Sequence, residues 1–144
     1  MLFLNDFSDL LPHKGSMLLL DCVVRYDAFS IHCPATSHRR LDNPLRLDGK
    51  LSALTGIEYG AQAAGLHHAL LEQSPQQPLG TLAVARDVVI LAERLDDLTQ
   101  PLAINARRLA AEAGGCIYAF DVAHEGAALL RGRLTLALHT ATQP

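Results

Sequence analysis

GIEYGAQAAGL, residues 56–66, reads as a helix made almost wholly of small and apolar residues. A helix on a protein surface shows a broad charged side, whereas apolar residues nearly all round indicate a buried helix. Glu58 and Gln62 lie four positions apart and therefore share one face of this helix. A carboxylate rarely enters a buried helix without a partner or a purpose. Glu58 is therefore the first candidate for a functional residue.

The rest of the chain reads as strands, with the helix extending over about residues 52–72. The other expected elements are a short helix at 6–11, two strands at 17–26 and 30–34, and four strands at 82–92, 102–109, 116–123 and 129–139. Gly114-Gly115 and Glu125-Gly126 are the expected hairpin turns. One apolar helix with six strands has one economical arrangement, a sheet that wraps around the helix. Because leucine and alanine favour helices, an all-helical fold stays open as the alternative.

The composition is that of an ordinary globular chain. Its 144 residues predict a single domain; 49% are hydrophobic, 19% are charged, and the net charge is −3. No basic run exceeds Arg39-Arg40, and no apolar run reaches the length of a membrane span, so we expect neither a nucleic-acid partner nor a membrane span. The N-terminus lacks the positive region of a secretory signal. Cys22, Cys33 and Cys116 are odd in number and widely spaced, which favours a reducing, cytoplasmic location.

Taken from the residues alone, Glu58 has two interpretations. Thr55-Gly56-Ile57-Glu58 matches the capping box, in which a threonine and a glutamate three residues later satisfy each other's backbone donors. Alternatively, the carboxylate faces a cleft and takes part in chemistry. No pair of His, Cys, Asp or Glu residues has convincing spacing for metal ligands, so we expect no metal and no cofactor.

Two segments resemble a known family. LPHKGSMLLLD, residues 11–21, resembles the opening LPHR…(F/M)LL(V/L)D of the 3-hydroxyacyl-carrier-protein dehydratases, and EYGAQAAG, residues 58–65, resembles their helix motif E-x-x-A-Q-A-x-G. The small dehydratases of aryl-polyene gene clusters are more similar still, with an LPHxGPMLLLD-like start and a GIEYMAQ-like helix. The resemblance implies an α+β hotdog fold, an antiparallel sheet wrapped around one central helix, in one domain over residues 1–144 that is normally dimeric.

The resemblance also implies a chemistry and roles for residues. Dehydrating a 3-hydroxyacyl thioester needs a base for the Cα proton, an acid for the departing hydroxyl, and donors for the thioester oxygen. Glu58 corresponds to the acid, the Gly56 N–H at the helix start to an oxyanion donor, and Gln62 to the group that orients Glu58. The predicted substrate-binding residues are Gly56, Gln62, Arg39 and Arg40, and the two arginines give the loop before the helix a basic character. That loop is expected either to dock an acidic acyl carrier protein or to be merely solvated.

One departure from the family bears on activity. The stretch 43–56 holds no histidine, whereas the dehydratases carry their base there. His13 and His38 are the nearest upstream candidates for the base. Three functions therefore stay open: a dehydratase of carrier-protein or coenzyme A thioesters, a weak or silent partner of an active hotdog dehydratase, and a thioesterase. Correspondingly, we expect a homodimer or a heterodimer with another hotdog protein.

Overall fold

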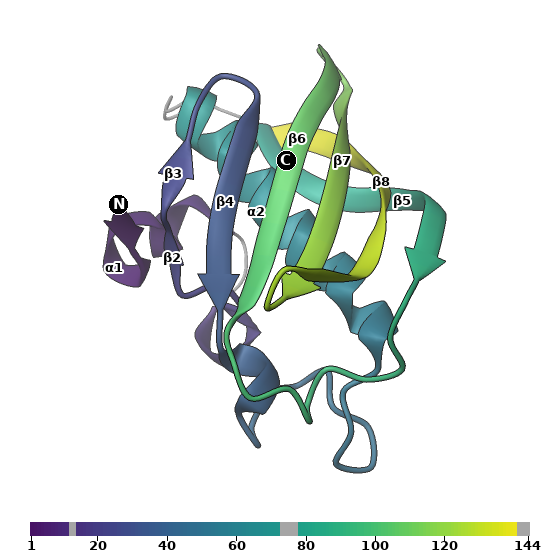
Figure 1. Cartoon of the computed structure of the whole chain (residues 1–144). Coiled ribbons are helices and arrows are strands. Elements are labelled where there is room, and N and C mark those ends of the chain that lie inside the picture. The colour runs from purple at the N-terminus through teal and green to yellow at the C-terminus, as the bar shows by residue number, and fades with distance from the viewer. Residues whose placement is uncertain (12–13, 73–77, 141–144) are drawn as a thin grey trace.

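A six-stranded antiparallel sheet packs against one long helix (Figure 1). The computed structural model describes residues 1–11, 14–72 and 78–140. In chain order, the helices and strands are β1 (Leu2–Phe3), α1 (Leu4–Phe7), β2 (Cys22–Val23), β3 (Arg25–Tyr26), β4 (Ser30–Ala35), α2 (Gly56–Glu72), β5 (Pro78–Ile90), β6 (Leu102–Glu112), β7 (Gly115–His124) and β8 (Ala127–Thr140). Short 3-10 turns lie at Ser8–Leu10, Gly15–Met17, Ser37–Arg39 and Ala53–Thr55.

The sheet has the order β3-β4-β6-β7-β8-β5, and every neighbouring pair is antiparallel. β1 and β2 form a small pair of their own beside it. The helix α2 crosses one face and contacts β4, β5, β6, β7 and β8, so the sheet curves around it (Figure 1). This arrangement confirms the predicted α+β hotdog fold and excludes the all-helical alternative.

Alternation along the strands explains how the core forms. In β4 and through most of β7, every second residue is buried, because successive side chains point to opposite faces of a strand. The buried set includes Tyr118 and Phe120, which pack toward the helix. Gly60 permits this contact, since a Cβ at that position would lie 2.4 Å from Phe120 Cδ2. As the apolar sequence predicts, α2 is buried around most of its circumference.

Two turns confirm the expected hairpins. Glu125 and Gly126 both have positive φ, 50° and 82°, which suits the tight two-residue connection between β7 and β8. Gly114 lies in the turn between β6 and β7.

The long strand predicted over 17–26 is wrong. The structure has a 3-10 turn at Gly15–Met17 and only the two short strands β2 and β3. The physical reason is that the backbone of Met17, Leu19 and Leu20 binds the side chain of Gln62 instead of a neighbouring strand. The predicted helix at 6–11 is also shifted, because α1 covers Leu4–Phe7 and a 3-10 turn follows it.

Candidate functional site

Glu58 lies in a groove at the beginning of α2. The groove has a volume of about 730 Å³ and lies between the loop that precedes α2 and the segment that follows β5. Its lining consists of Leu45, Leu47, Lys50, Ser52, Leu54, Thr55, Ile57, Glu58, Glu93 and Arg94. The two walls are joined by the Ala53 N–H, which donates to the Glu93 carbonyl at 3.0 Å. The groove therefore offers apolar side chains for a chain-like ligand and one half-buried carboxylate from the helix.

The start of the helix is capped by Ser52, not by Thr55. The Ser52 Oγ accepts from the Leu54 N–H at 3.2 Å, and the Thr55 hydroxyl donates to the Ser52 carbonyl at 2.7 Å. The capping-box interpretation of Glu58 is therefore wrong. No described residue forms a hydrogen bond or ion pair with the Glu58 carboxylate, which leaves it available in the groove.

Gly56 does not present a free donor to the groove. Its N–H points back to the carbonyls of Ala53 and Leu54 within the 3-10 turn, and the residue is buried. The N–H groups of Leu54 and Thr55 are also engaged, by the side chain and the carbonyl of Ser52. The expectation that the Gly56 N–H acts as an oxyanion donor is therefore not met in this structure.

Gln62 binds the N-terminal segment and not Glu58. Its Oε1 accepts from the N–H groups of Leu19 and Leu20, at 2.7 and 3.3 Å, and its Nε2 donates to the Met17 carbonyl at 2.9 Å. Only 2% of the residue is exposed, so it does not reach the groove. In this structure Gln62 therefore neither contacts Glu58 nor lines the groove, so its predicted roles in orienting Glu58 and in binding substrate stay predictions, and its observed role is to anchor residues 17–20 to the helix.

The structure describes only one of the two candidate bases, His13 and His38. His13 lies outside the described residues, so its role stays a prediction. His38 is fully buried in the 3-10 turn Ser37–Arg39, and its Nε2 lies 3.1 Å from the Leu98 carbonyl. Burial lowers the pKa of His38 below its ordinary value. Because His38 does not line the groove that holds Glu58, the structure does not bring these two residues together.

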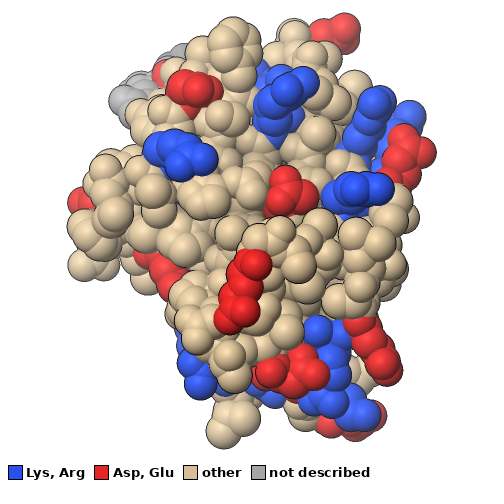
Figure 2. All heavy atoms as spheres, viewed as in Figure 1, with Lys and Arg blue, Asp and Glu red and all other residues tan. Residues whose placement is uncertain are grey.

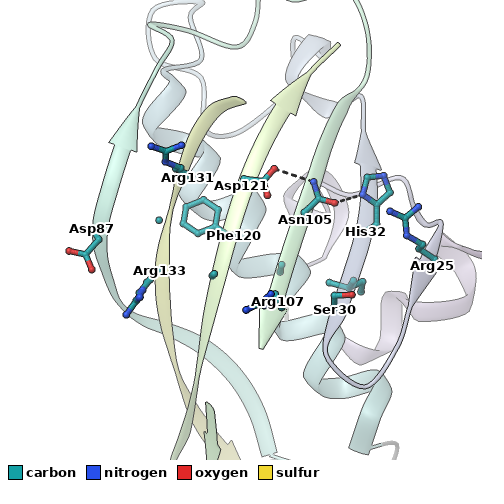
Figure 3. A pocket seen from close by; sticks show the side chains of 14 residues that line it. Arg25, Ser30, His32, Asp87, Asn105, Arg107, Phe120, Asp121, Arg131 and Arg133 are labelled. Atoms are coloured by element: carbon teal, nitrogen blue, oxygen red, sulfur yellow. Dashed lines mark hydrogen bonds between the residues drawn. The ribbon is translucent and has the colours of Figure 1, made fainter. Parts of the chain in front are cut away.

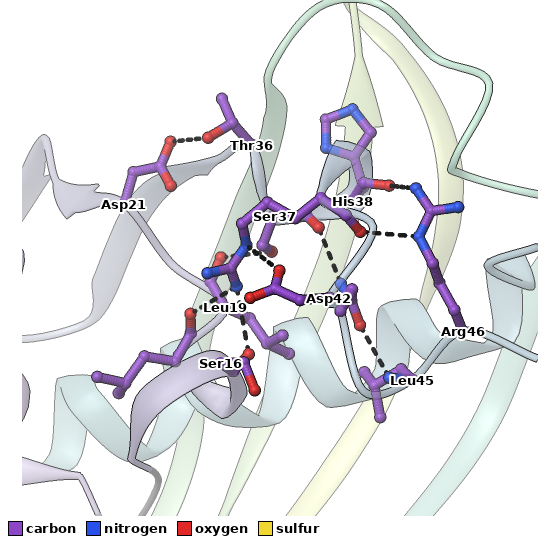
Figure 4. A network of polar contacts seen from close by, with 12 residues as sticks. Ser16, Leu19, Asp21, Thr36, Ser37, His38, Asp42, Leu45 and Arg46 are labelled. Atoms are coloured by element: carbon purple, nitrogen blue, oxygen red, sulfur yellow. Dashed lines mark hydrogen bonds and ion pairs between the residues drawn. The ribbon is translucent and has the colours of Figure 1, made fainter. Parts of the chain in front are cut away.

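The arginines before the helix brace the loop (Figure 4). Arg39 donates to the Thr99 carbonyl at 3.2 Å, and Arg40 donates to the Ser16 and Leu18 carbonyls at 3.2 and 3.4 Å. Neither lines the groove, so their predicted role in substrate binding is not supported. Arg46 holds the same loop through the carbonyls of Arg40, Gly49 and His38.

A buried polar network fixes the loop beside Glu58. The Tyr59 hydroxyl lies 2.7 Å from the Ser37 Oγ and accepts from the Asn43 Nδ2 at 3.2 Å. The Ser37 hydroxyl also lies 2.8 Å from the Leu19 carbonyl, and the Asn43 Oδ1 accepts from the Leu45 N–H at 2.9 Å. Burial raises the pKa of Tyr59. Since Tyr59 follows Glu58 directly, this network sets the position of the groove wall relative to the carboxylate.

Two cations that line the groove were not predicted as site residues. Arg94 pairs with Asp96, and this guanidinium holds the pKa of that carboxyl well below its usual range. The Asp96 carboxylate also accepts from the Leu51 N–H at 2.8 Å and so ties the post-β5 segment to the residues before the helix. Lys50 contributes a second positive charge. Its place in the basic loop was the sequence signal for it, whereas nothing local marked Arg94.

Comparison with known proteins decides the family. The model of the ApeP-like family, described as ApeP dehydratase, matches residues 5–143. The chain belongs to the ApeP-like dehydratase family. No curated protein matches the chain.

Solved structures of similar fold include dehydratases and thioesterases. The dehydratase heterocomplex ApeI:P from Xenorhabdus doucetiae gives a TM-score of 0.81 at 24% identity, over 94% of this chain and 92% of that chain. A hypothetical thioesterase with coenzyme A from Streptococcus pneumoniae gives 0.61 at 13% identity, over 95% and 97% of the two chains. A mutant thioesterase from Pseudomonas aeruginosa gives 0.53 at 14% identity, over 83% and 81%. At these identities the likeness establishes the shared fold.

Among the described residues, no cluster of three or more His, Cys, Asp or Glu side chains has a geometry that could hold a metal ion. In the same part of the chain, no helix combines the length and the apolar character needed to cross a membrane.

Proposed function

We propose that this member of the ApeP-like family contributes Glu58 to the dehydration of 3-hydroxyacyl thioesters, and that it works together with a second hotdog subunit. The observation that carries the proposal is the half-buried Glu58 carboxylate. It faces a largely apolar groove, and no described residue forms a hydrogen bond or ion pair with it. The family description and the fold shared with the ApeI:P heterocomplex support the same conclusion.

The reaction divides between an acid and a base. A base removes the proton on Cα, the bond from Cβ to the hydroxyl oxygen breaks, and the hydroxyl leaves as water with a proton from the acid. Glu58 is the proposed acid, because it is the carboxylate that the helix places in the groove. The apolar residues Leu45, Leu47 and Ile57 would hold the acyl chain, whose thioester is carried by an acyl carrier protein or coenzyme A.

The residues that line the groove are the reason for proposing a second subunit. No histidine is among the residues that line it in the described part of the chain, and His38 is buried elsewhere. A dehydration that needs a base near neutral pH would therefore take it from His13 or from a partner hotdog protein. A homodimer would offer only the histidines of this chain, whereas a heterodimer could supply a histidine that this chain lacks. The same observation favours the second candidate function, a silent subunit that supports an active partner.

The test is turnover of a 3-hydroxyacyl carrier protein, followed by mass spectrometry as loss of water. The purified chain is assayed alone, with a second hotdog dehydratase, and as Glu58→Gln in both settings. Water loss that requires the partner and falls in Glu58→Gln supports a shared site. If water loss requires the partner but proceeds at the same rate with Glu58→Gln, only the silent-subunit function remains. Release of free thiol from acyl thioesters that lack the 3-hydroxyl would instead identify a thioesterase.

A further inference from the structure

The face of the sheet turned away from α2 carries a second groove, with a volume of about 550 Å³ (Figure 3). Phe120 packs toward the helix, so its neighbours Ala119 and Asp121 on β7 face the opposite side. The register places outward residues in two rows across the strands. One row is Arg25, His32, Asn105, Asp121 and Arg131, and the other is Ser30, Arg107, Ala119 and Arg133.

The first row is held together at its centre. The Asn105 Oδ1 is hydrogen bonded to the His32 Nδ1, and its Nδ2 donates to the Asp121 Oδ2 at 3.1 Å (Figure 3). These three side chains are half-buried. They form a rigid polar floor on neighbouring strands, with exposed arginines at both ends of the row.

The arginines of this groove differ from the other arginines described above. Arg39, Arg40, Arg46 and Arg94 each donate hydrogen bonds to backbone carbonyls or to a carboxylate of this chain. In contrast, the guanidinium groups of Arg25, Arg107, Arg131 and Arg133 bind no described residue, although Asp87 and Asp121 line the same groove. Four positive charges against two negative ones give this face a positive balance on a chain of net charge −3. Figure 2 shows blue side chains spread over the upper part of this face, with red ones between them.

The spacing of these charges sets the size of the ligand. From β3 to β8 the sheet advances four strand steps, about 19 Å at the usual spacing between strands. A single phosphate or carboxylate cannot reach both ends of that span. An α-helix lying across the strands would cover it with about 13 residues at 1.5 Å per residue, and its diameter of about 10 Å suits the two rows. Carboxylates on one side of such a helix would meet the free guanidinium groups, which bind carboxylates in a bidentate manner.

The mixed charge favours a protein over a nucleic acid. A phosphate backbone would meet Asp87 and Asp121 in the same groove, and affinity for nucleic acid depends mainly on neutralising many phosphates. A helix that is mostly acidic and also carries a cation or an amide can match both the arginines and the polar floor. Asp87 of β5 lines the outer groove, and Glu93 and Arg94, which follow β5, line the Glu58 groove.

We propose that this outer face docks the acidic helix of an acyl carrier protein, through Arg25, Arg107, Arg131 and Arg133. The identity of the partner rests on the proposed function, which already requires a carrier-borne thioester. A carrier that binds here lies beside the strand that leads to the Glu58 groove. The interaction is predominantly electrostatic, so it weakens as the ionic strength rises.

The test uses an apo acyl carrier protein, which has no prosthetic arm and therefore cannot occupy the Glu58 groove. Its affinity is measured by isothermal titration calorimetry at low and high salt against the full chain and its variants. We expect Arg107→Glu and Arg133→Glu each to weaken binding, and the double variant to weaken it at least about tenfold. Lys14→Glu, which changes the net charge as much as either single variant and lies outside the groove, is the matched control and leaves the affinity within about twofold.

Three results would overturn the proposal. The first is an unchanged affinity in the double variant, and the second is the absence of binding by the apo carrier protein. The third is that the unmodified chain binds a single-stranded oligonucleotide instead of the carrier protein, and that the double variant loses this binding. Circular dichroism of each variant shows that the fold is intact. Glu58→Gln is expected to keep normal affinity for the apo carrier, so a failure of docking and a failure of the proposed chemistry give different results.

Discussion

Gln62 Oε1 accepts a hydrogen bond from the backbone N–H of Leu19 at 2.7 Å. The two residues are 43 positions apart, and both are buried. This bond, with those to Leu20 and Met17, replaces the strand pairing that an apolar run would otherwise find. The amide of Gln62 therefore determines how the N-terminal segment meets the central helix.

Gln62→Leu should lower the free energy of unfolding by about 2–4 kcal/mol, because it leaves the buried Leu19 N–H and Met17 carbonyl without a partner while keeping a similar volume. Urea unfolding followed by circular dichroism measures this loss. Gln100→Leu, at an exposed position, is the control and should stay within about 0.5 kcal/mol of the unmodified protein. A Gln62→Leu variant with normal stability but no turnover would instead point to a role in orienting Glu58.

Gly60→Ala should destabilise the protein although alanine favours helices. The new Cβ would lie 2.4 Å from Phe120 Cδ2 and 2.7 Å from its Cγ, so the ring or the helix must move. Overpacking of this kind costs about 1–3 kcal/mol, and the helix propensity of alanine returns at most about 1 kcal/mol. Thermal unfolding measures the difference. Gly114→Ala meets no atom within 4 Å and should leave the melting temperature nearly unchanged; equal effects at the two sites would contradict the close packing of β7 on α2.

The buried histidines should make the protein less stable in weak acid. Burial lowers the pKa of His38, His67 and His68 below the ordinary value of 6.5. The unfolded chain therefore binds more protons than the folded one as the pH falls below 6.5, so stability rises with pH in that window and is lost toward acid. The slope is at most about 1.4 kcal/mol per pH unit for each histidine that takes up a proton on unfolding.

Urea unfolding between pH 5 and pH 8 measures this dependence, with the pH range set by the titration of histidine. His68 is the sharpest case, since both of its ring nitrogens are buried and have no hydrogen-bond partner among the described residues. A stability that is flat or increases toward acid would show that these histidines are already charged in the folded protein.

The sequence allowed the central helix and the four strands after it to be predicted, because their apolar periodicity reflects burial directly. It also singled out Glu58, whose charge conflicts with the apolar helix around it. The roles of Gly56 and Gln62 could not be predicted from their spacing. The N–H of Gly56 is engaged by a 3-10 turn that begins at Ala53, and the partners of Gln62 lie more than 40 positions away in the chain. Local spacing carries no information on contacts of that range.

The loop before the helix shows the same limit. Its arginines suggested a charged docking surface, but Arg39 and Arg40 bind nearby backbone. The arginines without a described partner, such as Arg107 and Arg133, lie far apart in the chain and come together only through strand register.

The central claim is that the Glu58 carboxylate acts on the substrate and does not stabilise the helix. The most direct measurement compares Glu58→Gln with Glu72→Gln, which makes the same change at the exposed end of the same helix. Water loss from a 3-hydroxyacyl carrier protein is followed by mass spectrometry, with the second hotdog subunit present, and the melting temperature of each variant is recorded. We expect Glu58→Gln to lower the rate at least about a hundredfold with an unchanged melting temperature, and Glu72→Gln to keep the full rate. A Glu58→Gln variant that retains the full rate, or loses it only through unfolding, would contradict this account.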